Sequence, residues 1–257
     1  MSWRRSWVIV RQDARLLRSD PAFTIIFLVM PIVTMAFMKP AFRAALVAAG
    51  ARGANGSEQA VPGMAVMFGF FLVGNVGFGV FREHGWHTWE RLRASWARPG
   101  EILLGKATVP LATVAMQLGV LFGVGSLVFG LRVRGSILAL GAVAAALALC
   151  IAALGFTLLA VCRTVMQLNA ATNLGSLVYA GLGGALTPIS VLPGWARAVA
   201  PGTPSYWAMR GFRAVILQSG GLSSVALPVG VLLAFAAGFS AVAVVRFRFE
   251  ETKVDWA

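Results

Sequence analysis

REHGWHTWERLRASWARPGEILLGK, residues 82–106, lies between two long apolar runs and is rich in charged residues and tryptophan. At 100° per residue on a helix, its large apolar side chains fall within about 120° of the circumference: Trp86, Trp89, Leu92 and Trp96. Polar residues, among them Arg91 and Arg98, take the opposite side. Pro99 then ends this helix or kinks it into the next one. The pattern predicts an amphipathic surface helix over residues 82–98, too polar to cross a bilayer.

The composition places the whole chain in a membrane. Of its 257 residues, 58% are hydrophobic and 12% are charged, whereas soluble domains carry about 25% charged residues. The formal net charge of +13 does not indicate nucleic acid, because the arginines lie between apolar runs rather than along one basic face. This distribution is typical of contact with anionic lipid head groups. We therefore expect one integral membrane domain, residues 1–257. Its expected partner is membrane lipid, and it is not expected to bind nucleic acid.

The apolar runs predict six transmembrane helices, at residues 22–38, 61–81, 107–131, 136–161, 165–186 and 222–245. Each is near the length of roughly 20 residues that crosses the hydrocarbon core. A short polar loop is expected at residues 39–60. Six spans put both termini on one side, and most of the 22 Lys and Arg residues fall on that side. The positive-inside rule therefore places both termini in the cytoplasm, and the predicted fold class is an all-α membrane protein.

Two further segments flank these spans. Residues 1–20 carry Trp3 and Trp7 on one helical face and arginines on another, which predicts an N-terminal amphipathic helix at the membrane interface. Residues 187–213 contain four prolines, and the pieces between them are too short to cross a bilayer. Their Trp and Tyr residues favour the membrane–water boundary. We expect extracellular re-entrant or surface helices there, between the fifth and sixth spans.

Two helical faces are candidates for a substrate path. In the second span, three aromatic residues and one amide share a face: Phe68, Phe71, Asn75 and Phe78. In the fifth span, polar residues recur at i, i+4 and i+7: Asn169, Asn173 and Ser176. An aromatic wall with few polar groups suits an amphipathic organic molecule. Ordinary helix packing explains the first face equally simply, and buried amides that seal a helix contact explain the second.

Two patterns imitate binding motifs. Residues 100–106 fit GxxxxGK, but Ala107 stands where a nucleotide-binding loop needs Ser or Thr for magnesium, and no strand precedes it. A second pattern resembles a metal site: Glu83, His84, His87 and Glu90. Its context, one face of an aromatic surface helix, favours solvated side chains. No Asp, Glu or His lies within a proposed span, which argues against a proton-driven carrier or an intramembrane nucleophile–His pair. We predict no metal, cofactor or nucleotide site in this chain.

The run FREHGWHTWERLRASWARPGEILLGK, from residue 81, resembles the segment after the second span of ABC-2 type permeases, in particular the daunorubicin-resistance-like drug exporters. The pattern is an acidic residue, then Thr-Trp-Glu-Arg-Leu-Arg, Arg-Pro and Gly-Lys. It is matched by Glu83, Thr88, Trp89, Glu90, Arg91, Leu92, Arg93, Arg98, Pro99, Gly105 and Lys106. The resemblance extends over the whole layout of spans, including the re-entrant pair before the last one.

The resemblance implies a transport subunit of the bacterial cell membrane, without an active site of its own. ATP and Mg would be bound by a separate ABC ATPase subunit, present in two copies, and a second permease, identical or related, would complete the path. Residues 82–98 would be the coupling helix on which the ATPase docks, through Glu83, Thr88, Trp89, Glu90, Arg91 and Leu92. The expected substrate is an amphipathic drug-like or lipid molecule.

Two other functions are compatible with the residues alone. A membrane enzyme of lipid or glycan metabolism would need polar catalytic groups near a membrane face, for which the fifth span and residues 187–213 are the candidates. A membrane scaffold that transports nothing would need no catalytic groups. Activity of the purified chain without an ATPase would favour the enzyme, and purification from the host with no ATPase would favour the scaffold.

Overall fold

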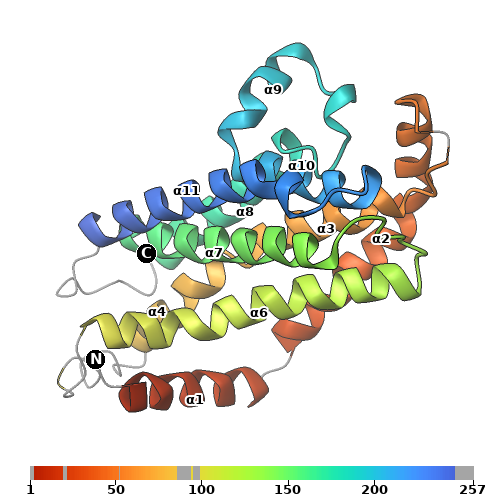
Figure 1. Ribbon diagram of the computed structural model, residues 1–257. Helices are drawn as coiled ribbons and strands as arrows, with labels where there is room; N and C mark the ends of the chain where they lie inside the picture. Colours follow the sequence, from red (N-terminus) through yellow and green to blue (C-terminus); the bar gives the residue numbers. More distant parts are fainter. Residues whose placement is uncertain (1–2, 20–21, 52, 86–93, 95–98, 247–257) are drawn as a thin grey trace.

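The computed structural model describes residues 3–19, 22–51, 53–85, 94 and 99–246, and all regular structure in these residues is helical (Figure 1). The elements are α1 (Trp3–Ser19), α2 (Ala22–Ala48), α3 (Ser57–Phe71), α4 (Gly74–Gly85), α6 (Pro99–Leu127), α7 (Ile137–Val161), α8 (Val165–Leu182), the 3-10 turn η1 (Ile189–Val191), α9 (Gly194–Val199), the 3-10 turn η2 (Ala200–Gly202), α10 (Pro204–Leu217) and α11 (Leu222–Arg246).

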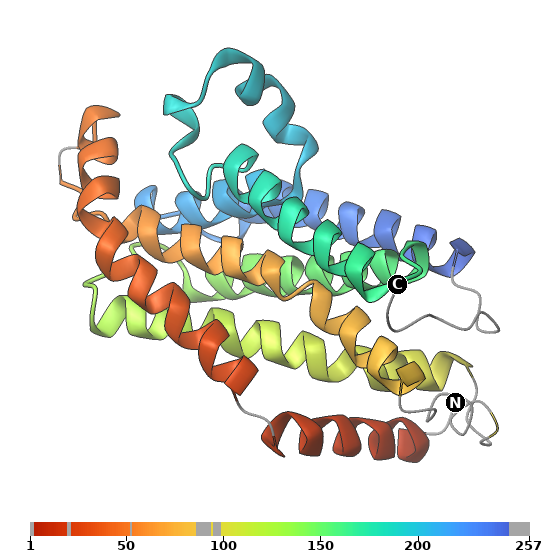
Figure 2. The same cartoon turned by 180° about the vertical axis from the view of Figure 1, so that it is seen from behind.

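The long helices lie side by side in a bundle with two distinct ends (Figures 1 and 2). We call the end at which α1 begins and α11 ends the terminal end; α4 also ends there and α6 begins there. Five segments among the described residues are long and apolar enough to cross a membrane: Ile25–Ala48, Ser57–Glu83, Leu104–Leu127, Ile137–Val161 and Leu222–Arg246. These agree with five of the six predicted spans, although their boundaries differ.

The first span is longer than the sequence predicts. α2 continues through Pro31 and Pro40 to Ala48, so residues 39–48 are helical and not part of a polar loop. The extension buries Phe42 and Leu46, which offsets the backbone hydrogen bond that Pro40 cannot make.

The second span begins at Ser57, four residues earlier than predicted. Gly56 precedes it with φ of 94°, a conformation in which a side chain is strained. A Cβ there would also lie 2.3 Å from the Lys39 carbonyl oxygen of α2. The span is broken near its middle, because Val73 N donates to Phe70 O at 3.1 Å in an i→i−3 bond before α4 resumes at Gly74.

α8 occupies most of the predicted fifth span but is not among the five apolar segments. It begins after Thr164, whose Oγ1 accepts from Gln167 N at 3.2 Å, a standard N-cap. Its amides lower its hydropathy.

The proline-rich segment forms two different structures. η1, α9 and η2 project from the flank of the bundle (Figure 1). α10 instead packs against α3, α7, α8 and α11, and its Phe212 is fully buried, with its ring 5.0 Å from that of Phe122 in α6. α10 has 14 residues, most of them buried; the re-entrant character of this segment stays a prediction.

α7 is central, with α11 packed along it. Its Gly155 crosses the break in the second span so closely that a Cβ would lie 2.7 Å from Val73 O. α1 is helical as predicted, but it runs lengthwise beside the first half of α6 (Figures 1 and 2). Its position at the membrane interface stays a prediction. Its Ile9 is buried while Trp7 is 66% exposed.

Candidate coupling and translocation site

The coupling segment itself lies mainly outside the described residues. Its predicted contacts Thr88, Trp89, Glu90, Arg91 and Leu92 are among residues 86–93, which are not described. The structure does place its two stems, α4 before it and the start of α6 after it, at the terminal end (Figure 1).

A buried charge cluster joins these stems. Lys106 Nζ of α6 donates to Glu83 Oε1 of α4 at 2.7 Å and to Asp13 Oδ1 of α1 at 2.8 Å. The exposed fractions of the three side chains are 6%, 8% and 14% respectively. A buried lysine needs such partners, because an unpaired charge in the interior is costly. We call Asp13, Glu83 and Lys106 the charge cluster.

Two predicted features, Glu83 and residues 100–106, lie in or beside the charge cluster. Glu83, expected in the docking element, points into the protein and bonds Lys106. Residues 100–106 form the first turns of a helix, whereas a phosphate-binding GxxxxGK is a loop. Asp13 was not singled out in the sequence, because charge patterning within α1 carries no sign of a partner in α6.

The surroundings of the Asp13 carboxyl disfavour its ionised form. Burial raises the pKa of its carboxyl above the ordinary 3.8, and the Lys106 ammonium counteracts this rise by its charge and its hydrogen bond. Glu83 adds to the rise by like-charge repulsion. Two carboxylates therefore contact one ammonium, and the charge of the nearby Arg82 guanidinium also lowers the pKa of Asp13.

Two predicted path residues of the second span face a groove beside this cluster. Asn75 and Phe78 of α4 line a space of about 280 Å³ between α1, α4 and α6. Lys106, Asp13, Pro110 and others complete the lining. The remaining aromatic residues, Phe68 and Phe71, form a ring pair with centroids 5.9 Å apart, nearer the middle of the span. The predicted aromatic face is therefore split by the break between α3 and α4.

The polar stripe of α8 is also divided. Asn169 and Asn173 are exposed, and Asn173 Nδ2 donates to Asn169 Oδ1 at 2.8 Å. Their neighbours Met166, Leu174 and Leu177 are exposed and apolar. Ser176 is buried instead, and its Oγ donates to Thr172 O at 2.6 Å. Two amides on an apolar exposed face form a polar stripe that lipid alone would solvate poorly.

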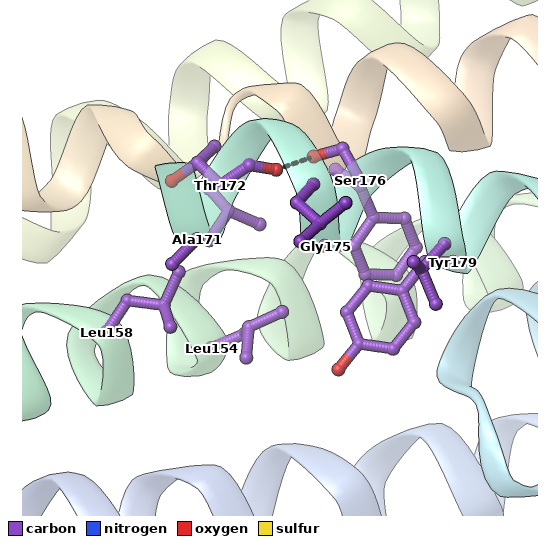
Figure 3. Close-up of a pocket in the computed structure, with 11 residues that line it drawn as sticks. Leu154, Leu158, Ala171, Thr172, Gly175, Ser176 and Tyr179 are labelled. Atoms are coloured by element: carbon purple, nitrogen blue, oxygen red, sulfur yellow. Dashed lines mark hydrogen bonds between the residues drawn. The ribbon is translucent and has the colours of Figure 1, made fainter. Parts of the chain in front are cut away.

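A second hollow opens between α7 and α8 (Figure 3). It has a volume of about 380 Å³ and is lined mainly by apolar residues, including Leu154 and Leu158 of α7. The hydroxyl of Tyr179 points away from α8, and its ring lies 4.9 Å from that of Phe70. Thr172 Oγ1 is buried, with no hydrogen-bond partner in the described part of the chain. Sequence reasoning missed this hollow because its lining is mostly ordinary span residues.

In the described residues, no group of three or more His, Cys, Asp or Glu side chains has the geometry of a metal site. His87 and Glu90 of the candidate cluster lie outside these residues.

Comparison with known proteins identifies the family. The ABC-2 type transporter family profile matches residues 4–217, most of the chain. No curated protein matches the sequence. The membrane domain of this family is a permease subunit that lacks a nucleotide-binding domain and pairs with ATPase subunits, which bind ATP. With its five candidate membrane spans, the chain belongs to the ABC-2 type transporter family, as a multi-pass permease subunit.

Proposed function

We propose that this permease belongs to an exporter of amphipathic drug-like or lipid molecules, similar to the daunorubicin-resistance-like subgroup. The observation that carries the coupling role is the convergence of both stems of residues 82–98 at one end of the bundle, fixed by the bond between Glu83 and Lys106. A segment held in this way is presented to a partner at that end. The substrate class rests on the aromatic and amide residues of the candidate path and on the resemblance of the coupling segment.

The proposed topology has six spans with both termini in the cytoplasm of a bacterial cell membrane. α7 and α11 run in the same direction (Figure 1), which supports one further crossing between Val161 and Leu222. α8 is the helix that supports this crossing: its 18 residues extend about 27 Å at 1.5 Å per residue, close to the hydrocarbon thickness of about 30 Å. The terminal end is then the cytoplasmic end, where basic residues prevail.

The proposed docking element consists of Thr88, Trp89, Glu90, Arg91 and Leu92, supported from within by Glu83. Two ATPase subunits would each engage one permease at this element. Glu83 bonds Lys106 inside the protein, so its part in docking is to hold the element in place. In this proposal, residues 1–257 form a single transmembrane domain.

The proposed path lies between two permease copies, identical or related. The exposed amide pair, Asn169 and Asn173, would face that path from α8, since a polar stripe is better solvated there than in lipid. The aromatic, amide and hydroxyl groups at other depths of the path would come from Phe68, Phe71, Asn75, Phe78 and Ser176.

The docking role is tested by charge reversal. Glu90→Arg is expected to prevent co-purification of the ATPase subunit from the native host while the permease remains inserted in the membrane. Arg134→Glu is the matched control, because Arg134 is exposed in the connection between α6 and α7 at the far end. Equal recovery of ATPase with the Glu90→Arg permease and with the unaltered one would refute this docking element.

A further inference from the structure

The second span and α6 each contain a point at which the helix is weakened. In the second span, the hydrogen bonds change from the i→i−4 to the i→i−3 pattern at Val73 and Asn75, between α3 and α4. In α6, Pro110 has no N–H, so the carbonyl of Lys106 lacks its usual i→i−4 donor. Helices bend preferentially at such positions. We call these two points the joints.

Both joints lie at the same level of the bundle. Asn75, directly after the first joint, and Pro110 line the same groove of about 280 Å³. The groove therefore leaves room beside the joints for the segments on either side to change their angle.

The charge cluster ties together the parts of the chain on the terminal side of the joints. The ion pair between Lys106 and Glu83 joins the first turns of α6 to α4. The ion pair between Lys106 and Asp13 joins α1 to α6 and, through Lys106, to α4. α1 is also connected to α2 by the sequence, because two residues separate Ser19 from Ala22. A chain of that length spans at most about 11 Å when extended. Movement of α1 therefore has to reach α2.

We propose that α1, α4 and the start of α6 form one movable unit, held together by Lys106, which pivots at the joints and carries motion of the coupling segment to α2. Lys106 is a positioning residue in this scheme. The inference rests on the proposed function, because the driving motion comes from an ATPase docked on residues 82–98. It goes further by assigning the route of that motion to an ion pair between α1 and α6.

The proposal is tested by a distance measurement in the reconstituted complex with its ATPase. Spin labels are placed at Val8 of α1 and Val245 of α11, both of which are exposed; the native Cys150 and Cys162 are buried. The distance distribution is recorded with no nucleotide and with ADP–vanadate. The unaltered permease is expected to show a nucleotide-dependent shift.

Asp13→Asn removes the charge that binds α1 to Lys106 but keeps the size of the side chain. We expect the fraction of molecules whose label-to-label distance changes with ADP–vanadate to fall about fivefold or more, while the complex still hydrolyses ATP. Arg15→Gln, which removes an exposed charge of α1 outside the cluster, should shift like the unaltered permease. A normal shift in Asp13→Asn overturns the proposal.

Pro110→Ala provides a second test that leaves the cluster intact. It restores an N–H donor for the Lys106 carbonyl and stiffens α6, so it too should reduce the shift; a full shift in this variant overturns the role of the joint. An unaltered complex that shows no shift, although the ATPase is bound, also overturns the inference. Unchanged ATPase binding by the Glu90→Arg permease would count against the proposed function alone, so the two failures are distinguishable.

Discussion

Replacing Lys106 with Met should be among the most destabilising single changes outside the apolar core. Lys106 is 6% exposed and is bonded to two carboxylates that are themselves largely buried. Its removal would take away the ammonium that both the Glu83 and the Asp13 carboxylates contact. Breaking a buried ion pair by removing one partner costs about 3–5 kcal/mol. For a chain of this length, 1 kcal/mol corresponds to roughly 2–4 °C, so we expect the melting temperature to fall by about 6–20 °C.

The triple variant Lys106→Met, Glu83→Gln and Asp13→Asn separates charge from packing. It keeps side chains of similar volume but buries no charge, and such replacements are often neutral or stabilising. We therefore expect it to recover most of the stability that the single change loses. Arg15→Gln is the surface control and should stay within about 0.5 kcal/mol of the unaltered protein.

The assay is the fraction of monodisperse permease that survives heating in detergent, at one heating rate for all variants, because unfolding of membrane proteins is often irreversible. A Lys106→Met protein that melts within about 2 °C of the unaltered one would show that the cluster is solvated. A triple variant no more stable than the single one would show that the loss comes from packing and not from unpaired charge.

Two further predictions concern α7 and α1. Gly155→Ala should lower the free energy of unfolding by about 1–3 kcal/mol, since its Cβ would meet Val73 O at 2.7 Å. Gly141→Ala, on the same helix, has nothing within 4 Å of its Cβ, so its free energy of unfolding should be unchanged or higher by up to about 1 kcal/mol. Equal melting temperatures for the two variants would contradict the close crossing. Because the pKa of Asp13 is raised in the folded protein, folding favours its protonated form, so the ionised carboxyl weakens the fold at neutral pH and the fold gains stability as the pH falls toward 4. Asp13→Asn should therefore melt at or above the unaltered protein at pH 7, with a difference that narrows at lower pH; a difference that widens on acidification would reverse the assigned sign.

The sequence was sufficient for the architecture because hydropathy and length are local properties. The α7 and α11 spans were predicted nearly to the residue, since each is an uninterrupted apolar run bounded by polar residues. α2 was cut short in the prediction at Lys39 and Pro40, because a charge followed by proline usually ends a helix. The residues that override this signal, Phe42 and Leu46, are buried, and their burial depends on tertiary contacts that the local pattern does not contain.

The candidate site was less predictable for the same reason. The charge cluster joins residues 93 positions apart in the chain, Asp13 and Lys106, and no periodicity links them. The stripe on α8 was predicted as one face, but its members lie near the edge between exposed and buried sides, so Asn173 and Ser176 have different environments. Periodicity gives the angle of a residue on its helix; it does not give the position of the neighbouring helices.

The buried position of α10 has a consequence for biosynthesis. Of the helices that enclose it, α3, α7 and α8 precede it in the chain, whereas α11 is synthesised last. During membrane insertion α10 must therefore wait, with the side that packs on α11 uncovered, until the ribosome has delivered α11. A chain truncated before Leu222 would present this uncovered helix to the quality-control proteases of the cell, so premature stop mutations near the C-terminal end should remove the protein rather than leave a partly active one.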